Sequence, residues 1–174
     1  MFKEISELVV FLDNPTREIN VREYARLARI SPATASKNLH SFAKEGILKK
    51  RQERMLILYK ANLDHDFYQD VKVFYNIRKI KDSGLLEALN SFYLKPTVVL
   101  FGSASFGLDI ETSDFDILIV SERTQDFPDK VKFEHKIKRP LQLFIVKGIK
   151  EVRNEKLRNN IVNGTVIQGK IQWS

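Results

Sequence analysis

The sequence predicts an α+β protein made of an N-terminal helical unit with a basic hairpin, a helical connector, and a C-terminal α/β unit with a small mixed sheet. Apolar residues recur at three- and four-residue steps through residues 1–46, which is the pattern of amphipathic helices. After residue 96, short apolar runs alternate with helical patterns, as in an α/β sheet. We therefore expect three parts, at residues 1–62, 63–84 and 85–174.

Composition narrows the function classes. The chain has 174 residues, of which 43% are hydrophobic, so it is able to bury a core. Its net charge of +7 lies mostly in residues 1–62 and favours polyanionic partners. The absence of cysteine excludes disulfides and thiolate sites. No apolar run approaches the roughly 18 residues of a membrane span, so we expect a cytoplasmic protein with no membrane partner.

Three helices are expected in the first part. The first stops at Asn14-Pro15, Asn20 caps the second with Glu23 completing a capping box, and Ser31-Pro32 starts the third. The residues expected to face the core are Phe2, Ile5, Leu8 and Leu12, then Tyr24, Leu27 and Ala28, and finally Ala35, Leu39 and Phe42. Gly46 ends the third helix.

A hairpin is expected to follow, with strands at 47–48 and 55–59 and a turn that holds Lys49, Lys50, Arg51 and Arg54. Together with the segment Ile30-Ser31-Pro32-Ala33-Thr34-Ala35-Ser36-Lys37-Asn38-Leu39, then Phe42 and Gly46-Ile47-Leu48, this pattern resembles a winged helix-turn-helix domain of bacterial and archaeal regulators. The resemblance covers residues 1–62. It implies that the third helix enters the major groove of DNA while the hairpin touches the flanking backbone.

The helical spacing points a set of small or polar side chains outward from the third helix. These candidate DNA-binding residues are Ala33, Thr34, Ser36, Lys37 and His40, and Arg51 and Arg54 on the hairpin suit phosphate contact. Two alternatives stay open. In the first, the domain serves protein contact or dimerisation alone and does not bind DNA. In the second, Arg51 and Arg54 belong to an ordinary solvated turn.

The connector is expected to hold a helix at about 66–81. Phe67, Val71, Phe74 and Ile77 line one side of it, and further apolar residues lie elsewhere on its circumference. Such a helix is buried against this chain or against another copy. Because helix-turn-helix readers commonly pair on two half-sites, we predict a homodimer with this helix in the interface.

Residues 97–120 combine two strands with a polar motif at their junction. The first strand, 97–101, runs into Gly102-Ser103, and the second, 115–120, begins with Asp114-Phe115-Asp116. Alternation along a strand puts both aspartates on one face, where a divalent cation would relieve their repulsion. Mg²⁺ favours a few carboxylates plus substrate phosphates. Gly102 lets the backbone approach a phosphate and Ser103 can donate to it, which predicts a ligand that carries phosphates.

With its 12-residue separation between Gly102 and Asp114, this motif resembles the DNA polymerase β-like nucleotidyltransferases, in particular their minimal stand-alone branch. The resemblance covers about residues 85–174 and includes the closing segment Ile161-Val162-Asn163-Gly164-Thr165-Val166. It implies Mg²⁺-dependent nucleotidyl transfer with Asp114 and Asp116 as catalytic and metal-binding residues. The acceptor implied is macromolecular, often a toxin-like partner protein.

Two positions depart from the family pattern. Phe106 stands before Gly107, where an arginine or lysine is usual, and Gln142 stands where the next core strand, 141–146, usually supplies a third carboxylate. Glu134 or Asp109 is a possible substitute for that carboxylate. Two functions therefore stay open: a nucleotidyl-transferring enzyme, or a DNA-binding transcriptional regulator whose transferase domain is catalytically degenerate. Helices at 85–94, 129–136 and 150–162 and a strand at 166–171 complete the expected unit.

Overall fold

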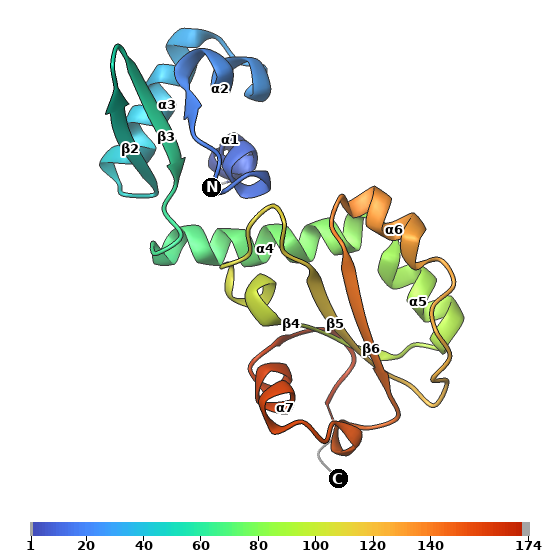
Figure 1. The fold of residues 1–174 in the computed structure, drawn as a ribbon. Coiled ribbons are helices and arrows are strands. Elements are labelled where there is room, and N and C mark those ends of the chain that lie inside the picture. Colours follow the sequence, from blue (N-terminus) through green and yellow to red (C-terminus); the bar gives the residue numbers. More distant parts are fainter. Residues whose placement is uncertain (1, 172–174) are drawn as a thin grey trace. The chain divides into compact units, whose positions relative to one another are not determined.

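The computed structural model describes residues 2–171, with side chains from residue 5 onward, so the expectation for the Phe2 side chain lies outside the described residues. The chain divides into two compact units between Lys72 and Val73. Seven α-helices and two sheets lie in the described part, a mixed α and β composition as predicted (Figure 1). Across residues 2–171, no helix has the length and apolar character needed to cross a membrane.

The first unit contains three helices and a three-stranded antiparallel sheet. Its elements are α1 (Phe2–Asp13), β1 (Ile19–Asn20), α2 (Val21–Ala28), α3 (Pro32–Lys44), β2 (Leu48–Glu53) and β3 (Leu56–Ala61), with the strands in the order β1-β3-β2. The predicted caps are present, because the Asn20 side chain accepts from the Glu23 N–H at 3.0 Å and the Ser31 hydroxyl accepts from the Thr34 N–H at 3.1 Å. The capping box predicted at Glu23 is not formed, because the Glu23 carboxylate pairs with Arg17 instead.

The core of this unit follows the helical periodicity, with one correction. Leu8, Leu12, Tyr24, Ala35, Leu39 and Phe42 are buried as predicted. Leu27 is exposed instead, because the two-turn helix α2 buries Tyr24 and Ala25 on a single strip.

The hairpin is longer than predicted. Lys49, Lys50 and Arg51 lie within β2, and the turn is formed by Arg54 and Met55. The sequence does not predict the full length of β2 because the strand is exposed on both faces after Leu48 and so has no alternation of apolar and polar residues. It is held by its backbone pairing with β3.

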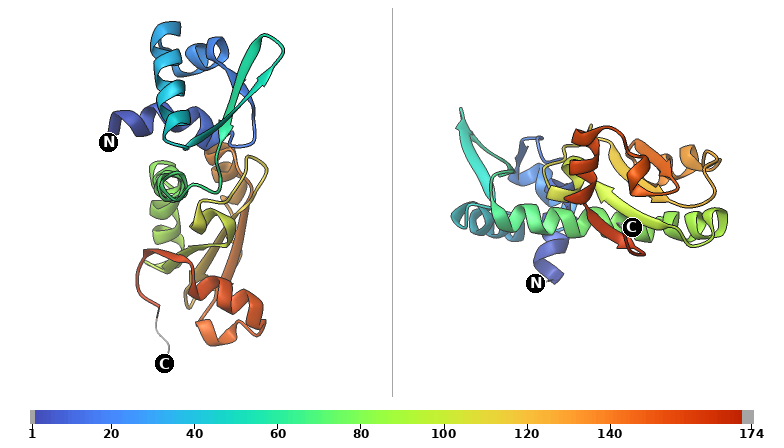
Figure 2. Two further views of the ribbon diagram at one scale, coloured as in Figure 1. Left: turned by 90° about the vertical axis from the view of Figure 1, so that its left-hand side faces the viewer. Right: turned by 90° about the horizontal axis from the view of Figure 1, so that it is seen from below.

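Helix α4 (Asp66–Asp82) begins in the first unit and ends in the second, and Figure 2 (right) shows it as one unbroken helix. Phe67 and Phe74 are not buried within this chain, since they are 42% and 44% exposed. The fully buried positions repeat at four-residue steps instead and are Tyr68, Lys72, Asn76 and Ile80.

Hydrogen bonds explain which side of α4 is buried. The Tyr68 hydroxyl donates to the Phe11 carbonyl at 2.9 Å, and the Lys72 ammonium donates to the Leu12 carbonyl. These carbonyls belong to the last turn of α1, where intrahelical partners are missing. Polar side chains therefore take buried positions that hydropathy assigns to apolar ones.

The second unit is built around a four-stranded mixed sheet in the order β6-β5-β4-β7. Its elements are α5 (Leu85–Tyr93), β4 (Thr97–Phe101), η1 (Gly102–Phe106), β5 (Phe115–Val120), α6 (Lys130–Ile137), β6 (Leu141–Val146), η2 (Ile149–Glu151), α7 (Glu155–Val162) and β7 (Thr165–Gln168). Strands β5 and β6 are parallel, and the other pairs are antiparallel.

Helices cover both faces of this sheet. One core contains residues of α5, α6 and the end of α4 packed against Phe115, Ile117 and Ile119 of β5. The other contains Leu118 and Ile161, under α7 and η2 (Figure 1). The single helix expected at 150–162 is two separate elements, because the Asn154 side chain accepts from the Leu157 N–H and starts α7 there.

Candidate functional site

Strand register brings the two halves of the Gly-Ser and Asp-x-Asp motif together. In the antiparallel pair of β4 and β5, Phe101 lies opposite Asp116, so Gly102 follows directly at the end of β4. In the parallel pair of β5 and β6, Asp116 lies opposite Gln142. Alternation places Asp116 on the sheet face of Leu118, under α7. Residues far apart in the sequence thus meet at one end and on one face of the sheet.

Gly102 lies so close to the Asp116 carboxylate that a side chain at this position would require the carboxylate to move. A Cβ on Gly102 would lie 2.3 Å from Asp116 Oδ2, and the Gly102 φ of +71° is in the left-handed region. The sequence predicts a glycine here for approach to a phosphate. The structure adds that the missing side chain of Gly102 leaves the space that the Asp116 carboxylate occupies.

The two aspartates form a small centre of negative charge. Partial burial, and then the neighbouring Asp114 carboxylate, raise the pKa of Asp116. In the part of the chain that the structure describes, neither carboxylate has a hydrogen-bond or ion-pair partner. Two unpaired carboxylates beside a glycine turn suit a divalent cation that also takes phosphate oxygens.

The turn that follows β4 is held by its own hydrogen bonds. The Ser105 hydroxyl donates to the Gly102 carbonyl at 2.8 Å, and the Leu108 N–H donates to the Ser103 carbonyl at 3.0 Å. The Ser103 hydroxyl bonds to no other described residue. It is therefore available to a ligand at the end of β4.

Neither candidate substitute for the third carboxylate is available. Asp109 is fully buried and bonded to Asn76 and Arg139, and the Glu134 carboxylate accepts from the Leu141 N–H at 2.9 Å. Gln142 is the exposed side chain beside Asp116. Among residues 2–171 there is no group of three histidine or acidic side chains placed to hold a metal ion.

Residues 82–167 match the nucleotidyltransferase domain family. The matched region contains the whole constellation from Gly102 to Gln142, the strands β4, β5 and β6, and most of β7. A search of curated proteins finds no match for the chain.

The candidate DNA-binding residues divide into two groups. All those on α3, namely Ala33, Thr34, Ser36, Lys37 and His40, are exposed. Arg54 lies at the tip of the hairpin with a φ of 53°. Arg51 lies within β2 instead, where its guanidinium pairs with Glu18 and, at 2.8 Å, with Glu53.

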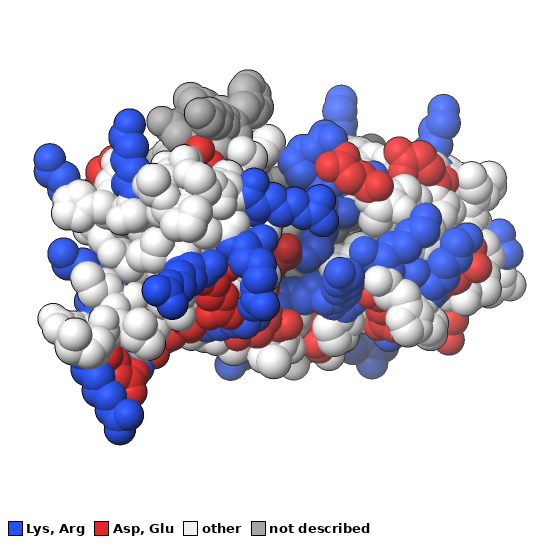
Figure 3. All heavy atoms as spheres, turned by 90° about the horizontal axis from the view of Figure 1, so that it is seen from above, with Lys and Arg blue, Asp and Glu red and all other residues white. Residues whose placement is uncertain are grey.

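Basic and acidic side chains lie beside one another on the surface. Figure 3 shows Lys and Arg interspersed with Asp and Glu on the face that it presents, with the basic side chains covering the larger area. The Arg51 contacts are one example, since the guanidinium beside Glu18 lowers the pKa of that carboxyl. The net positive charge is therefore spread over several elements.

Sequence reasoning missed two residues that shape this site. Asn76 and Arg139 are both buried and both bond to Asp109. The available signal for Asn76 was its spacing of four positions from Lys72, which places the two polar residues on one face of α4. Arg139, next to Pro140, gives no such signal.

Proposed function

We propose that the nucleotidyltransferase domain binds a nucleoside triphosphate with Mg²⁺ and transfers its nucleotidyl group, at a low rate, to a macromolecular acceptor such as a toxin-like partner protein. The contact between Gly102 and the Asp116 carboxylate carries this proposal, because it joins the phosphate-binding turn to the acidic pair. The match of residues 82–167 to the family supports it.

The chemistry assigned to this site is an in-line displacement. An acceptor hydroxyl oxygen bonds to the α-phosphorus, the bond from that phosphorus to the bridging oxygen breaks, and pyrophosphate leaves. Asp114 and Asp116 would hold Mg²⁺, which would neutralise charge on the phosphates, and Ser103 would donate to a phosphate oxygen. Gln142 has no carboxylate to accept the proton of the acceptor, so that proton would go to solvent, and we therefore expect a low rate.

Calorimetry with ATP and Mg²⁺ tests the binding step. The wild type is expected to bind, and the Asp114→Asn/Asp116→Asn double variant to lose affinity by at least about tenfold, because each carboxylate contributes to the cation site. Asp129→Asn, an exposed aspartate at the start of α6, removes a charge elsewhere in the same unit and serves as the control. Absence of binding by the wild type contradicts the proposal.

A second function, a DNA-binding transcriptional regulator with a degenerate transferase domain, is favoured by Gln142 opposite Asp116. Incubation with labelled nucleoside triphosphates, Mg²⁺ and cell lysate separates the two. If the site lacks only its third carboxylate, Gln142→Asp raises labelling above that of the wild type. If both proteins bind ATP and neither labels an acceptor, the regulator is the better account.

For the first unit we propose DNA binding in the manner of a winged helix-turn-helix domain. The exposed face of α3 and the antiparallel hairpin beside it support this proposal. Lys37→Ala is expected to weaken binding to the protein's own promoter region by about 1–3 kcal/mol if it contacts a base. Lys156→Ala removes the same charge from α7 and is expected to change little. Equal affinities for wild type and Lys37→Ala at low salt contradict the base contact.

The two arginines of the hairpin are expected to differ. Arg54→Ala should lower the salt dependence of DNA binding by about one phosphate contact, whereas Arg51→Ala should lower it less, because Glu18 and Glu53 already occupy the Arg51 guanidinium. Titrations at several salt concentrations measure both slopes. The reverse order would place the phosphate contact on β2.

A further inference from the structure

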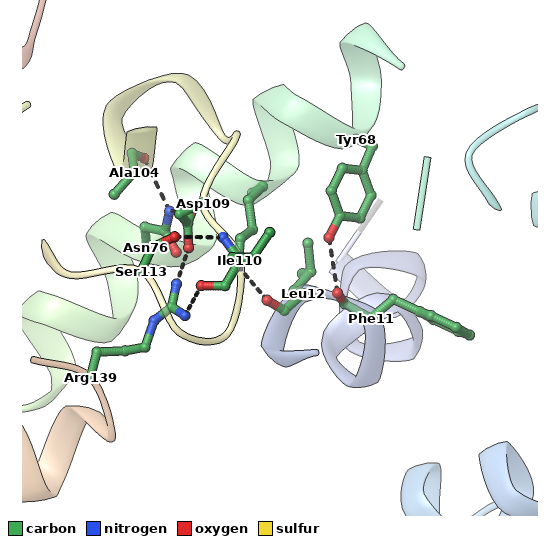
Figure 4. A network of polar contacts seen from close by, with 10 residues as sticks. Phe11, Leu12, Tyr68, Asn76, Ala104, Asp109, Ile110, Ser113 and Arg139 are labelled. Carbon is green, nitrogen blue, oxygen red and sulfur yellow. Dashed lines mark hydrogen bonds and ion pairs between the residues drawn. The ribbon is translucent and has the colours of Figure 1, made fainter. Parts of the chain in front are cut away.

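A buried polar cluster lies behind the loop that joins the two halves of the site. Asp109 is in the middle of this loop, which runs from Gly102 to Asp114, and its side chain is fully buried. Asn76 Nδ2 donates to Asp109 Oδ1 at 2.7 Å, and a guanidinium nitrogen of Arg139 donates to Asp109 Oδ2 (Figure 4). Both carboxylate oxygens are therefore held, by residues from α4 and from the turn before β6.

The same two partners also hold the loop backbone. Asn76 Nδ2 donates to the Ala104 carbonyl at 3.0 Å, and Arg139 donates to the Ile110 carbonyl (Figure 4). Next to Arg139, the Pro140 carbonyl accepts from the Phe115 N–H at 2.9 Å. The loop is thus fixed after Gly102 and Ser103, at its middle, and at the start of β5 between the two aspartates.

We propose that Asp109, held by Asn76 and Arg139, is the positioning residue that keeps the 102–114 loop in the geometry needed by the triphosphate site. The proposal rests on the proposed function of that site. Asp109 does not itself reach a ligand, because no part of it is exposed. It acts through the loop, whose ends carry the phosphate-binding turn and the acidic pair.

The cost of this arrangement indicates that it serves the site. A buried ion pair is weak evidence for stability, since apolar residues of similar volume often replace one without loss. The cluster instead fixes the conformation of the loop, because five hydrogen bonds from two side chains and one backbone amide define its path. Binding groups held in this way lose little freedom when a ligand arrives.

The test uses Asn76→Ala in the full chain. This variant removes two loop contacts and leaves the pair of Asp109 and Arg139 intact, so it is more suitable than Asp109→Asn, which strands a buried guanidinium. The matched control is Asn90→Ala, which breaks a similar side-chain pair with Gln168 in the same unit. That pair lies beside Pro96, at the end of β4 opposite to Gly102.

Two measurements are made on the wild type and both variants: amide hydrogen exchange of residues 102–114, and calorimetry with ATP and Mg²⁺. In Asn76→Ala we expect exchange to accelerate in this loop and the affinity for Mg²⁺ and ATP to fall by about tenfold or more. In Asn90→Ala we expect wild-type values for both. Thermal melts show whether Asn76→Ala and Asn90→Ala lower the melting temperature by similar amounts.

Each outcome decides the proposal. If the wild type binds ATP and Asn76→Ala binds it equally well, or if both variants lose affinity alike, the positioning role is overturned while the proposed function stands. If the wild type binds no ATP, the proposed function falls, and exchange alone decides whether Asp109 holds the loop. Acceleration confined to 102–114 then supports that holding role, and uniform acceleration or none overturns it.

Discussion

Gly102 is the residue where two requirements meet, a left-handed backbone and the close approach of the Asp116 carboxylate. Gly102→Ala is therefore expected to lower the free energy of unfolding by about 1–3 kcal/mol and to displace the carboxylate, which weakens binding of Mg²⁺ and ATP. Urea unfolding and calorimetry measure the two effects. Gly148→Ala is the control, because a Cβ there meets no atom within 4 Å and the Gly148 φ is −158°. Similar losses in both variants would contradict the steric account.

The raised pKa of Asp116 leads us to expect that the stability of the fold depends on pH. Its pKa is raised in the folded protein, so the folded state binds this proton more tightly than the unfolded state does. Ionisation then costs stability, and the loss develops as the pH rises from the unfolded pKa through the folded one. Asp116→Asn is expected to be more stable than the wild type at pH 7, with the difference disappearing near pH 3, where Asp116 is protonated in both states.

Asp64 provides the control of opposite sign. The Lys49 ammonium, 2.6 Å from the Asp64 carboxylate, lowers the pKa of Asp64. The ionised form therefore stabilises the fold, and this contribution is present above the unfolded pKa and lost as the pH falls through the folded one. Asp64→Asn should reduce stability at neutral pH and have no effect in strong acid. Urea titrations at both pH values measure the pair, and changes of one sign in both variants would contradict the assignment.

At the level of single residues, the sequence predicts those site residues whose positions follow from local rules such as strand alternation. Gly102, Ser103, Asp114 and Asp116 follow from strand alternation and glycine chemistry, and they meet where the register requires. Asn76 and Arg139 escape prediction because their partner is Asp109, which is distant in sequence from both. A buried hydrogen bond between distant residues has no periodicity to reveal it.

At the scale of the element, different residues of α3 are expected to serve stability and DNA recognition. Ser31→Ala removes the cap on the Thr34 N–H and is expected to lower the free energy of unfolding by about 1 kcal/mol. Ser36→Ala, on the exposed face, is expected to leave stability unchanged and to weaken DNA binding. Thermal unfolding and DNA titration together measure the contrast. A stability loss in Ser36→Ala as large as that in Ser31→Ala would show that both serines serve the helix.

The bounds of elements were predictable where side chains alternate or caps are explicit. Strands β4, β5 and β6 lie at the predicted residues because their apolar runs are short and bounded by polar residues. The full length of strand β2, of which only the start was predicted, and the break before α7 were missed. The first depends on backbone pairing with β3, and the second on one capping bond from Asn154.

At the scale of the whole molecule, we expect a homodimer. Phe67 and Phe74 are seven residues apart on α4, so they lie on one face of the helix, and both are partly exposed. Phe74→Glu is expected to weaken self-association at micromolar concentration by about tenfold or more, as measured by sedimentation. Val131→Glu, at a 60% exposed position of α6, is the control. A monomeric wild type would contradict the prediction and leave these side chains as solvated surface.

The place of β7 in the sheet has a consequence for the time course of folding. Its partner β4 ends more than sixty residues earlier in the chain, and their pairing closes a long loop. Docking also requires Gly164, because a Cβ there would lie 2.6 Å from the Leu100 carbonyl oxygen. Until β7 arrives, β4 presents an open, apolar edge that another chain is able to pair with. We therefore expect the kinetic competition between folding and aggregation to be decided at this edge, and Gly164→Ala to shift it toward aggregation in refolding experiments.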